Sequence, residues 1–141
     1  MSSFKIFDIA GSGMSAQSVR LNTVASNLAN ADSLSGDANS VYKAKHPVFQ
    51  AVMGSVAGLG SDQSTAQVKV TGISESQAAP ETRYDPGNPL ADAQGNVFAP
   101  NVNVVEEMAD MISASRSYQN NVEVLNTSRD MMLATLKLGQ S

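Results

Sequence analysis

The last quarter of the chain carries a very long apolar stripe. Between residues 103 and 138, apolar side chains recur at alternating steps of four and three, the spacing of a heptad repeat. The stripe comprises Val104, Met108, Met111, Ser115, Tyr118, Val122, Leu125, Arg129, Met132 and Leu136. A second stripe beside it comprises Val105, Ala109, Ile112, Gln119 and Leu133. This pattern predicts one helix roughly 50 Å long, whose two stripes need more apolar cover than a single partner helix offers.

The ends of this helix carry recognisable signals. Asn103 is a good N-cap residue, and Glu106 occupies the third helical position, as in a capping box. Gly139 follows the last apolar residue and is a plausible stop. The sequence therefore predicts a helix over residues 103–138.

A second amphipathic helix is predicted near the other end, over residues 3–30. Its stripe comprises Ile6, Ala10, Met14, Gln17, Leu21, Val24 and Leu28, widened by Ile9, Gly13, Ala16 and Ala25. The stripe stops within the segment SNLANADS, residues 26–33. Asn is one of the few non-Gly residues that tolerate the left-handed conformation at a helix end. The segment is therefore interpreted as a helix C-terminus leading into a loop.

The middle of the chain favours short strands and turns. Alternation predicts extended structure at 48–53, a strand at 67–73 and a short strand at Val97 and Phe98. Residues 54–66 and 74–82 are expected to be loops. Residues 84–89 (YDPGNP) predict a type II turn with a positive φ at Gly87, and DAQGNVF predicts a second turn. Asp85 and Asp92 are expected to form local hydrogen bonds in these turns.

The expected fold is mainly α with a small, loop-rich β region. The terminal helices, within residues 1–31 and 101–141, are predicted to pair as a coiled coil, with residues 32–100 inserted between them. Two helices cannot bury both stripes of the longer one, so assembly with other copies or other chains is predicted. The predicted assembly interface consists of Ile6, Ile9, Met14, Leu21, Val24, Leu28, Val104, Met108, Met111, Ile112, Tyr118, Val122, Leu125, Met132 and Leu136.

Composition excludes several functional classes. The chain has no Cys, a single His (His46) and a formal net charge of −4. Thiolate metal sites and Cys nucleophiles are therefore impossible, and a catalytic triad would have to use His46, which has no nucleophile motif around it. No basic run suggests nucleic-acid binding, and no apolar run approaches a membrane span or a cleaved secretory signal. No cofactor, metal site or small-molecule substrate is expected.

One motif suggests an enzyme. Gly11, Gly13 and Ala16 match the G-x-G-x-x-A dinucleotide fingerprint, and the preceding KIFDI could be its strand. The fingerprint has meaning only in a strand–turn–helix context with a second strand, which this sequence does not supply. The structural alternative is that Gly11 and Gly13 allow close helix approach or a bend.

Three segments carry a family resemblance. SNLANADS resembles the SNLAN signature of bacterial flagellar rod and hook proteins, at Ser26, Asn27, Leu28, Ala29 and Asn30. YKAKHPVFQA, at residues 42–51, and the whole stretch from residue 84 onward resemble the proximal-rod proteins of the flagellar basal body. Residues 54–82 carry no family signature.

This resemblance implies a structural protein and no enzymatic activity. Such proteins are exported without a cleaved signal peptide through the flagellar type III apparatus and assemble helically into the rod within the periplasm. Their terminal helices pair as an inner coiled-coil (D0) domain. The implied partners are other copies, the rod proteins FlgB and FlgF, and the export-gate junction protein FliE. The alternatives are another axial rod or hook subunit, a soluble coiled-coil adaptor, or a small nucleotide-binding protein using Gly11–Ala16.

Overall fold

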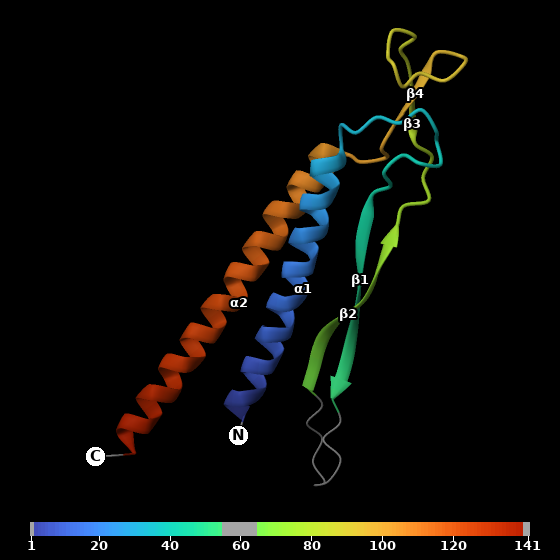
Figure 1. Cartoon of the computed structure of the whole chain (residues 1–141). Helices are drawn as coiled ribbons and strands as arrows, with labels where there is room; N and C mark the ends of the chain where they lie inside the picture. The colour runs from blue at the N-terminus through green and yellow to red at the C-terminus, as the bar shows by residue number, and fades with distance from the viewer. Residues whose placement is uncertain (1, 55–64, 140–141) are drawn as a thin grey trace.

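The computed structural model describes residues 2–54 and 65–139. Two long helices at the ends of the chain enclose four strands, in the order α1, β1, β2, β3, β4, α2 (Figure 1). The predicted arrangement of terminal helices around a small antiparallel β region is confirmed. The predicted loop at 54–66 lies almost wholly outside the described residues.

Helix α1 spans Ser2–Asn30, as its apolar periodicity predicts. It ends inside the SNLANADS segment, but not through a left-handed residue, because no described non-Gly residue has a positive φ. Instead, the Asn30 side chain donates to the Ser26 carbonyl, and the Ser33 hydroxyl donates to the Asn30 carbonyl. Backbone bonds from Ala31 to Leu28 and from Ser33 to Asn30 close the last turn beside these side-chain bonds. The predicted helix end is correct, but the predicted mechanism is wrong.

Strands β1 (Lys45–Gly54) and β2 (Thr65–Glu75) form a two-stranded antiparallel sheet. The register pairs Phe49 with Val70 and shifts between Val48 and Phe49, which marks a bulge. Pro47 lies inside β1, where it is tolerated because β1 has a partner on one side only. Both strands are longer than predicted, and β2 extends into residues expected to be loop.

Strands β3 (Glu81–Tyr84) and β4 (Asn96–Ala99) form a second antiparallel pair. The short strand at Val97 and Phe98 was predicted, whereas β3 was not. An isolated bridge between Ser35 and Phe98 ties the loop after α1 to β4. The pair therefore contacts the segment that follows α1, and its strand β4 leads into α2.

The turns between β3 and β4 differ from the type II prediction. The amide of Asn88 donates to the Asp85 carbonyl, which closes a turn around Pro86 and Gly87. Gly87 has no positive φ; the one positive φ among the described glycines belongs to Gly95, at +82°. Gly95 closes the second turn by donating to the Asp92 carbonyl at 3.0 Å. The second turn is therefore the one that needs a glycine conformation.

Helix α2 spans Val104–Leu138. Asn103 is its N-cap, and the Asn103 side chain accepts hydrogen bonds from the amides of Val105 and Glu106, as predicted. Gly139 follows the helix with a right-handed φ of −82°, so it ends the helix without the left-handed conformation.

The molecule is elongated, with α1 and α2 side by side and antiparallel (Figure 1). The β1–β2 hairpin lies along the opposite side of α1, and the β3–β4 pair stands at the end where α2 begins. Few large side chains are buried, and the largest of those that are fully buried are Val97 and Asn27. The buried apolar residues are Ala10, Ala16, Val24, Val41, Ala44, Val97, Ala99 and Ala114. No helix within the described ranges is long and apolar enough to cross a bilayer.

Candidate assembly interface

The contact face between α1 and α2 is built from small and polar side chains. Ala16 of α1 and Ala114 of α2 are buried, and the buried residues of α2 are Glu107, Ala114 and Ser128. These positions recur at steps of seven and fourteen, so they form a heptad stripe beside the predicted one. On α2, these are residues that neither predicted apolar stripe includes.

Asn27 is the hub of this face. Its side chain is fully buried at 0% exposure. Its Oδ1 accepts hydrogen bonds from the Lys45 amide and the Tyr42 hydroxyl, both at 2.9 Å. Its Nδ2 donates to the Lys45 carbonyl and to Oε1 of Glu107, both at 2.8 Å. All four hydrogen-bonding positions of the amide are used, so one side chain joins α1, β1 and α2.

The other members of the SNLAN signature support this hub. The Ser26 hydroxyl lies 3.2 Å from the Tyr42 hydroxyl, and Asn30 bonds to the Ser26 carbonyl. Leu28 is half-buried and Ala29 is exposed. The signature is therefore both a helix end and the point where the hairpin is fixed to the helices. Sequence reasoning missed the second role because the partners of Asn27 lie far along the chain.

Two further contacts connect the helices along their length. The guanidinium of Arg20 donates to the Asp110 carboxylate at 2.8 Å. Nearer the start of α1, a Cβ on Gly13 would lie 3.0 Å from Nδ2 of Asn121. A Cβ on Gly11 would meet nothing within 4 Å. Gly13 therefore allows close helix approach, but Gly11 does not have this role.

The nucleotide-binding alternative is wrong. Gly11, Gly13 and Ala16 lie in the interior of α1, and KIFDI is helical. The fingerprint requires a strand before the first glycine and a helix beginning after it, so that backbone amides face a phosphate. Here those amides belong to a continuous helix.

The predicted interface residues divide between covered and exposed positions. Val24 is the buried exception, so it is not available to a neighbouring chain. Those partly covered are Met14, Leu21, Leu28, Met111, Val122, Leu125 and Met132. Those exposed are Ile6, Ile9, Val104, Met108, Ile112, Tyr118 and Leu136. The structure thus places large apolar side chains of both helices at the surface.

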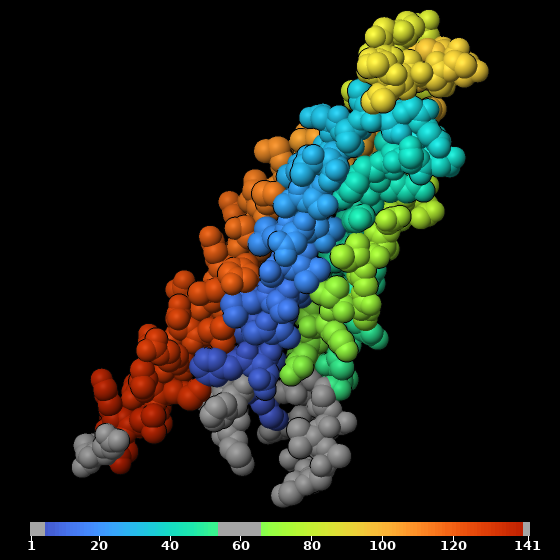
Figure 2. Space-filling view, in the orientation of Figure 1, coloured from blue at the N-terminus to red at the C-terminus, as the bar shows by residue number. Residues whose placement is uncertain are grey.

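The exposed apolar residues of α2 fall on two sides of its contact with α1. One side carries Val104, Val105, Met108, Ile112 and Leu133. The other carries Val124, Met131 and Leu138, which recur at steps of seven. This second set belongs to neither predicted stripe, although its spacing could have revealed it. Of the described helices and strands, α1 is the only element that packs against α2, and α2 runs along one edge of the molecule (Figure 2).

The hairpin also exposes apolar side chains. These are Val48, Phe49, Val52, Met53, Val68 and Ile73. Val52 and Met53 are successive residues of β1, so the exposed apolar side chains lie on both faces of the hairpin.

The described residues offer little catalytic chemistry. No group of three His, Cys, Asp or Glu side chains among them is placed to hold a metal ion. His46 lies in β1, paired with Ser74. The Asp92 carboxylate accepts hydrogen bonds from the amides of Asn96 and Gln94, which hold its pKa below the usual value. This is turn stabilisation, as predicted for Asp92.

The sequence of this chain is similar to those of known proteins. Residues 93–138 match the family model described as flagellar basal body rod FlgEFG protein C-terminal, and residues 7–33 match the model described as flagella basal body rod protein. The flagellar basal-body rod protein FlgC of Salmonella typhimurium is 56% identical over 140 residues, covering 99% of this chain and all of that protein. FlgC of Buchnera aphidicola from Acyrthosiphon pisum is 41% identical over 142 residues, covering 99% of this chain and all of its own. FlgC of Agrobacterium fabrum is 42% identical over 132 residues, covering 92% and 90% of the two chains.

The chain belongs to the flagellar basal-body rod proteins, a class of structural subunits. Within that class the similarity extends over nearly the whole chain to FlgC, so it is a FlgC-like component of the rod. The family resemblance inferred from SNLANADS and the C-terminal region is confirmed.

Proposed function

We propose that this chain assembles helically, through its terminal helices, into the tubular proximal rod that serves as the drive shaft of the flagellum. It acts as a structural subunit and not as an enzyme. The observation that supports this most directly is the surface of α2. Ile112 and Met108 are 55% and 53% exposed, whereas Ala114, on the face that contacts α1, is fully buried.

This distribution is unfavourable in an isolated chain. Burying apolar surface contributes roughly 25 cal/mol per Å². Here several large apolar side chains of α2, among them Met108, Ile112 and Leu136, remain in water. Neighbouring subunits on both sides of α2 would cover them. Because the two sides carry different residues, such contacts are heterologous, and heterologous contacts that do not close produce a helical assembly.

In this proposal, residues 1–31 and 101–141 form a D0-like coiled-coil domain, and residues 32–100 form the β region outside it. The assembly surface is the predicted set without Val24, joined by Val105, Val124, Met131, Leu133 and Leu138. The partners are other copies, FlgB, FlgF and the junction protein FliE. The chain reaches the periplasmic rod through the flagellar export apparatus, without a cleaved signal peptide. Its lack of Cys suits a subunit that is exported unfolded.

Replacement of the Salmonella typhimurium relative tests this function. We expect this chain, expressed in a strain lacking FlgC, to restore swimming and to be recovered in purified basal bodies. Ile112→Glu should abolish both, because it places a charge at an apolar contact. Ser113→Glu is the matched control, since it adds the same charge one residue away at an exposed polar position.

Three readouts separate the explanations. Circular dichroism of the purified variants should match that of the wild type, because Ile112 is exposed in the single chain. A wild-type chain that is exported but absent from basal bodies would overturn the proposed function. Normal swimming with Ile112→Glu would remove this face of α2 from the interface.

A further inference from the structure

The two ends of α2 expose apolar side chains that α1 does not cover. Val105, in the first turn, is 77% exposed, and Leu136, near the last turn, is 63% exposed. Every residue from Arg129 to Gly139 except Met132 is exposed. A helix of 35 residues is about 50 Å long, so its two ends cannot contact each other within one copy. Any contact between them must join different copies.

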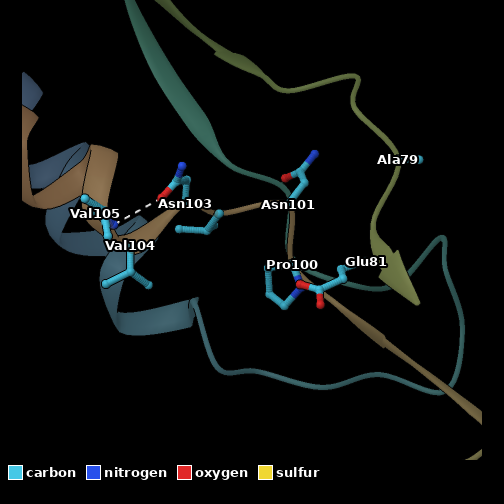
Figure 3. A pocket seen from close by; sticks show the side chains of 8 residues that line it. Ala79, Glu81, Pro100, Asn101, Asn103, Val104 and Val105 are labelled. Carbon is cyan, nitrogen blue, oxygen red and sulfur yellow. Dashed lines mark hydrogen bonds between the residues drawn. The ribbon is translucent and has the colours of Figure 1, made fainter. Parts of the chain in front are cut away.

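A hollow of about 470 Å³ lies beside the first turn of α2 (Figure 3). Pro100, Val102, Val104 and Val105 contribute apolar surface to it, and Glu81 of β3 stands on its lining. In Figure 3, Glu81 and Pro100 appear close together, and Val104 and Val105 stand on the first turn of α2.

The amide side chains that line this hollow already have partners. Asn101 accepts from the Ala44 amide and donates to the Ala78 carbonyl, both at 2.8 Å. Asn103 accepts from the amides that begin α2. These bonds engage the Asn101 amide and the oxygen of Asn103, and the rest of the lining includes the valine and proline surface and the Glu81 carboxylate. An occupant with apolar side chains and one basic group fits that lining.

The end of α2 has this chemistry. Leu133 shares one helix face with Arg129, Leu136 and Lys137, since it lies four residues after Arg129, three before Leu136 and four before Lys137. The first ten residues of α2 carry three acidic residues and no basic one. Glu107 is buried against Asn27 and Asp110 is paired with Arg20, so Glu106 is the acidic residue of this end that those contacts leave to a neighbour. The Glu81 carboxylate is held by Arg83 at 3.2 Å, on an exposed surface where it can accept a further donor. Glu81 and Glu106 at one end are opposite in sign to Arg129 and Lys137 at the other, where Asp130 is the one acidic residue, and this difference favours head-to-tail contact.

We infer that the hollow beside Val104 and Val105 receives the last turns of α2 from a second copy of this chain, with Leu136 inserted and Lys137 directed toward Glu81. The contact is heterologous, because the donor end and the acceptor hollow are different surfaces. This inference rests on the proposed assembly and deepens it by naming one of its contacts.

Disulfide cross-linking can test the contact, because the chain has no Cys of its own. Two variants, Val105→Cys and Leu136→Cys, are expressed together in the strain that lacks FlgC, and basal bodies are oxidised and analysed by mass. We expect a covalent dimer that contains one copy of each variant. A chain carrying both substitutions should give a ladder of higher multimers.

The controls define the outcome. Ser113→Cys, at another exposed position of α2, should give no link with Leu136→Cys. Lys137→Glu should cause loss of the link through repulsion from Glu81. A dimer formed by Val105→Cys alone, a link to a different protein, or no link would overturn the inference. Restoration of swimming by the wild-type chain tests the proposed function separately. If the wild-type chain restores swimming and the cross-link does not form, the inferred contact is wrong and the proposed function is unaffected.

Discussion

The Asn27 side chain donates a 2.8 Å hydrogen bond to Oε1 of Glu107, which joins the end of α1 to the first turn of α2 inside the molecule. Both side chains are at most 5% exposed. A buried carboxylate needs such a donor, because an uncompensated buried charge is strongly destabilising. The hydrogen bond therefore determines where the two helices meet.

We expect Asn27→Ala to reduce the free energy of unfolding by about 3 kcal/mol, because it leaves Glu107 and the Lys45 backbone groups without a partner. Urea unfolding followed by circular dichroism measures the loss. Asn30→Ala is the matched control, since Asn30 donates only to Ser26, one turn earlier in the same helix. Its effect should stay within about 0.5 kcal/mol. Equal losses for the two variants would show that Asn27 has no special role.

Asn27 shows which features of the structure apolar periodicity can predict and which it cannot. The 3.6-residue pattern located both helices, and Asn103 was correctly identified as an N-cap from its local sequence. The partners of Asn27 come from residues 42, 45 and 107, and their proximity depends on the tertiary fold. Local sequence therefore suggested a capping role and gave no sign of the hub.

The contact face of α2 escaped prediction for a related reason. Heptad counting finds large apolar residues, but α1 packs against Ala114 and Ser128. Small residues permit close approach and carry little apolar signal. The large residues selected by the pattern, such as Met108 and Ile112, are exposed in the single chain. In a subunit that assembles, the strongest apolar pattern can therefore mark contacts between chains.

Gly11 and Gly13 should respond differently to alanine. Gly11→Ala should stabilise the chain by about 1 kcal/mol, since alanine favours the helix and its Cβ would meet nothing within 4 Å. Gly13→Ala should gain less, because its Cβ would lie 3.0 Å from Nδ2 of Asn121. Thermal unfolding should therefore show a higher Tm for Gly11→Ala than for Gly13→Ala. Adding Asn121→Ala to Gly13→Ala should remove the difference; if it does not, steric contact with Asn121 is not the cause.

Gly95 and Gly87 provide a second matched pair, in the turns between β3 and β4. Gly95→Ala should destabilise the turn by about 2 kcal/mol, because a side chain at φ +82° is strained and its Cβ would meet Cε2 of Tyr84 at 3.0 Å. Gly87→Ala should be tolerated, since Gly87 has no positive φ and its nearest neighbour would lie at 3.7 Å. Amide exchange at Asp85 reports the change, because that amide donates to the Gly95 carbonyl. A larger loss of stability for Gly87→Ala than for Gly95→Ala would support the type II turn with a positive φ at Gly87 that the sequence predicted.

The turn at Asp92 should weaken in acid. The amides of Asn96 and Gln94 favour the ionised carboxylate and lower its pKa from the ordinary 3.8. A lowered folded-state pKa means that the stabilisation is present above 3.8 and is lost as the pH falls through the folded value. We expect the Gln94 and Asn96 amides to exchange faster as the pH falls below 3.8, after correction for the intrinsic rate. Asp92→Asn should abolish this extra acceleration, and an unchanged profile in that variant would assign it to another group.

The last turns of α2 should be ordered mainly by assembly. Residues near Ala114 are covered by α1, whereas those from Arg129 onward are exposed except Met132. A helical segment without packing is marginally stable in water, so it should open locally more often than the rest of the helix. Hydrogen exchange on the chain at low concentration should show slow exchange around residue 114 and fast exchange after residue 129.

Higher concentration, or addition of partner rod proteins, should slow exchange after residue 129 and increase the helical signal in circular dichroism. Sedimentation velocity on the same samples relates that gain to assembly. Uniform protection along α2 in a monomer at every concentration would show that the chain folds completely alone, and would remove coupled folding from the account of how this subunit enters the rod.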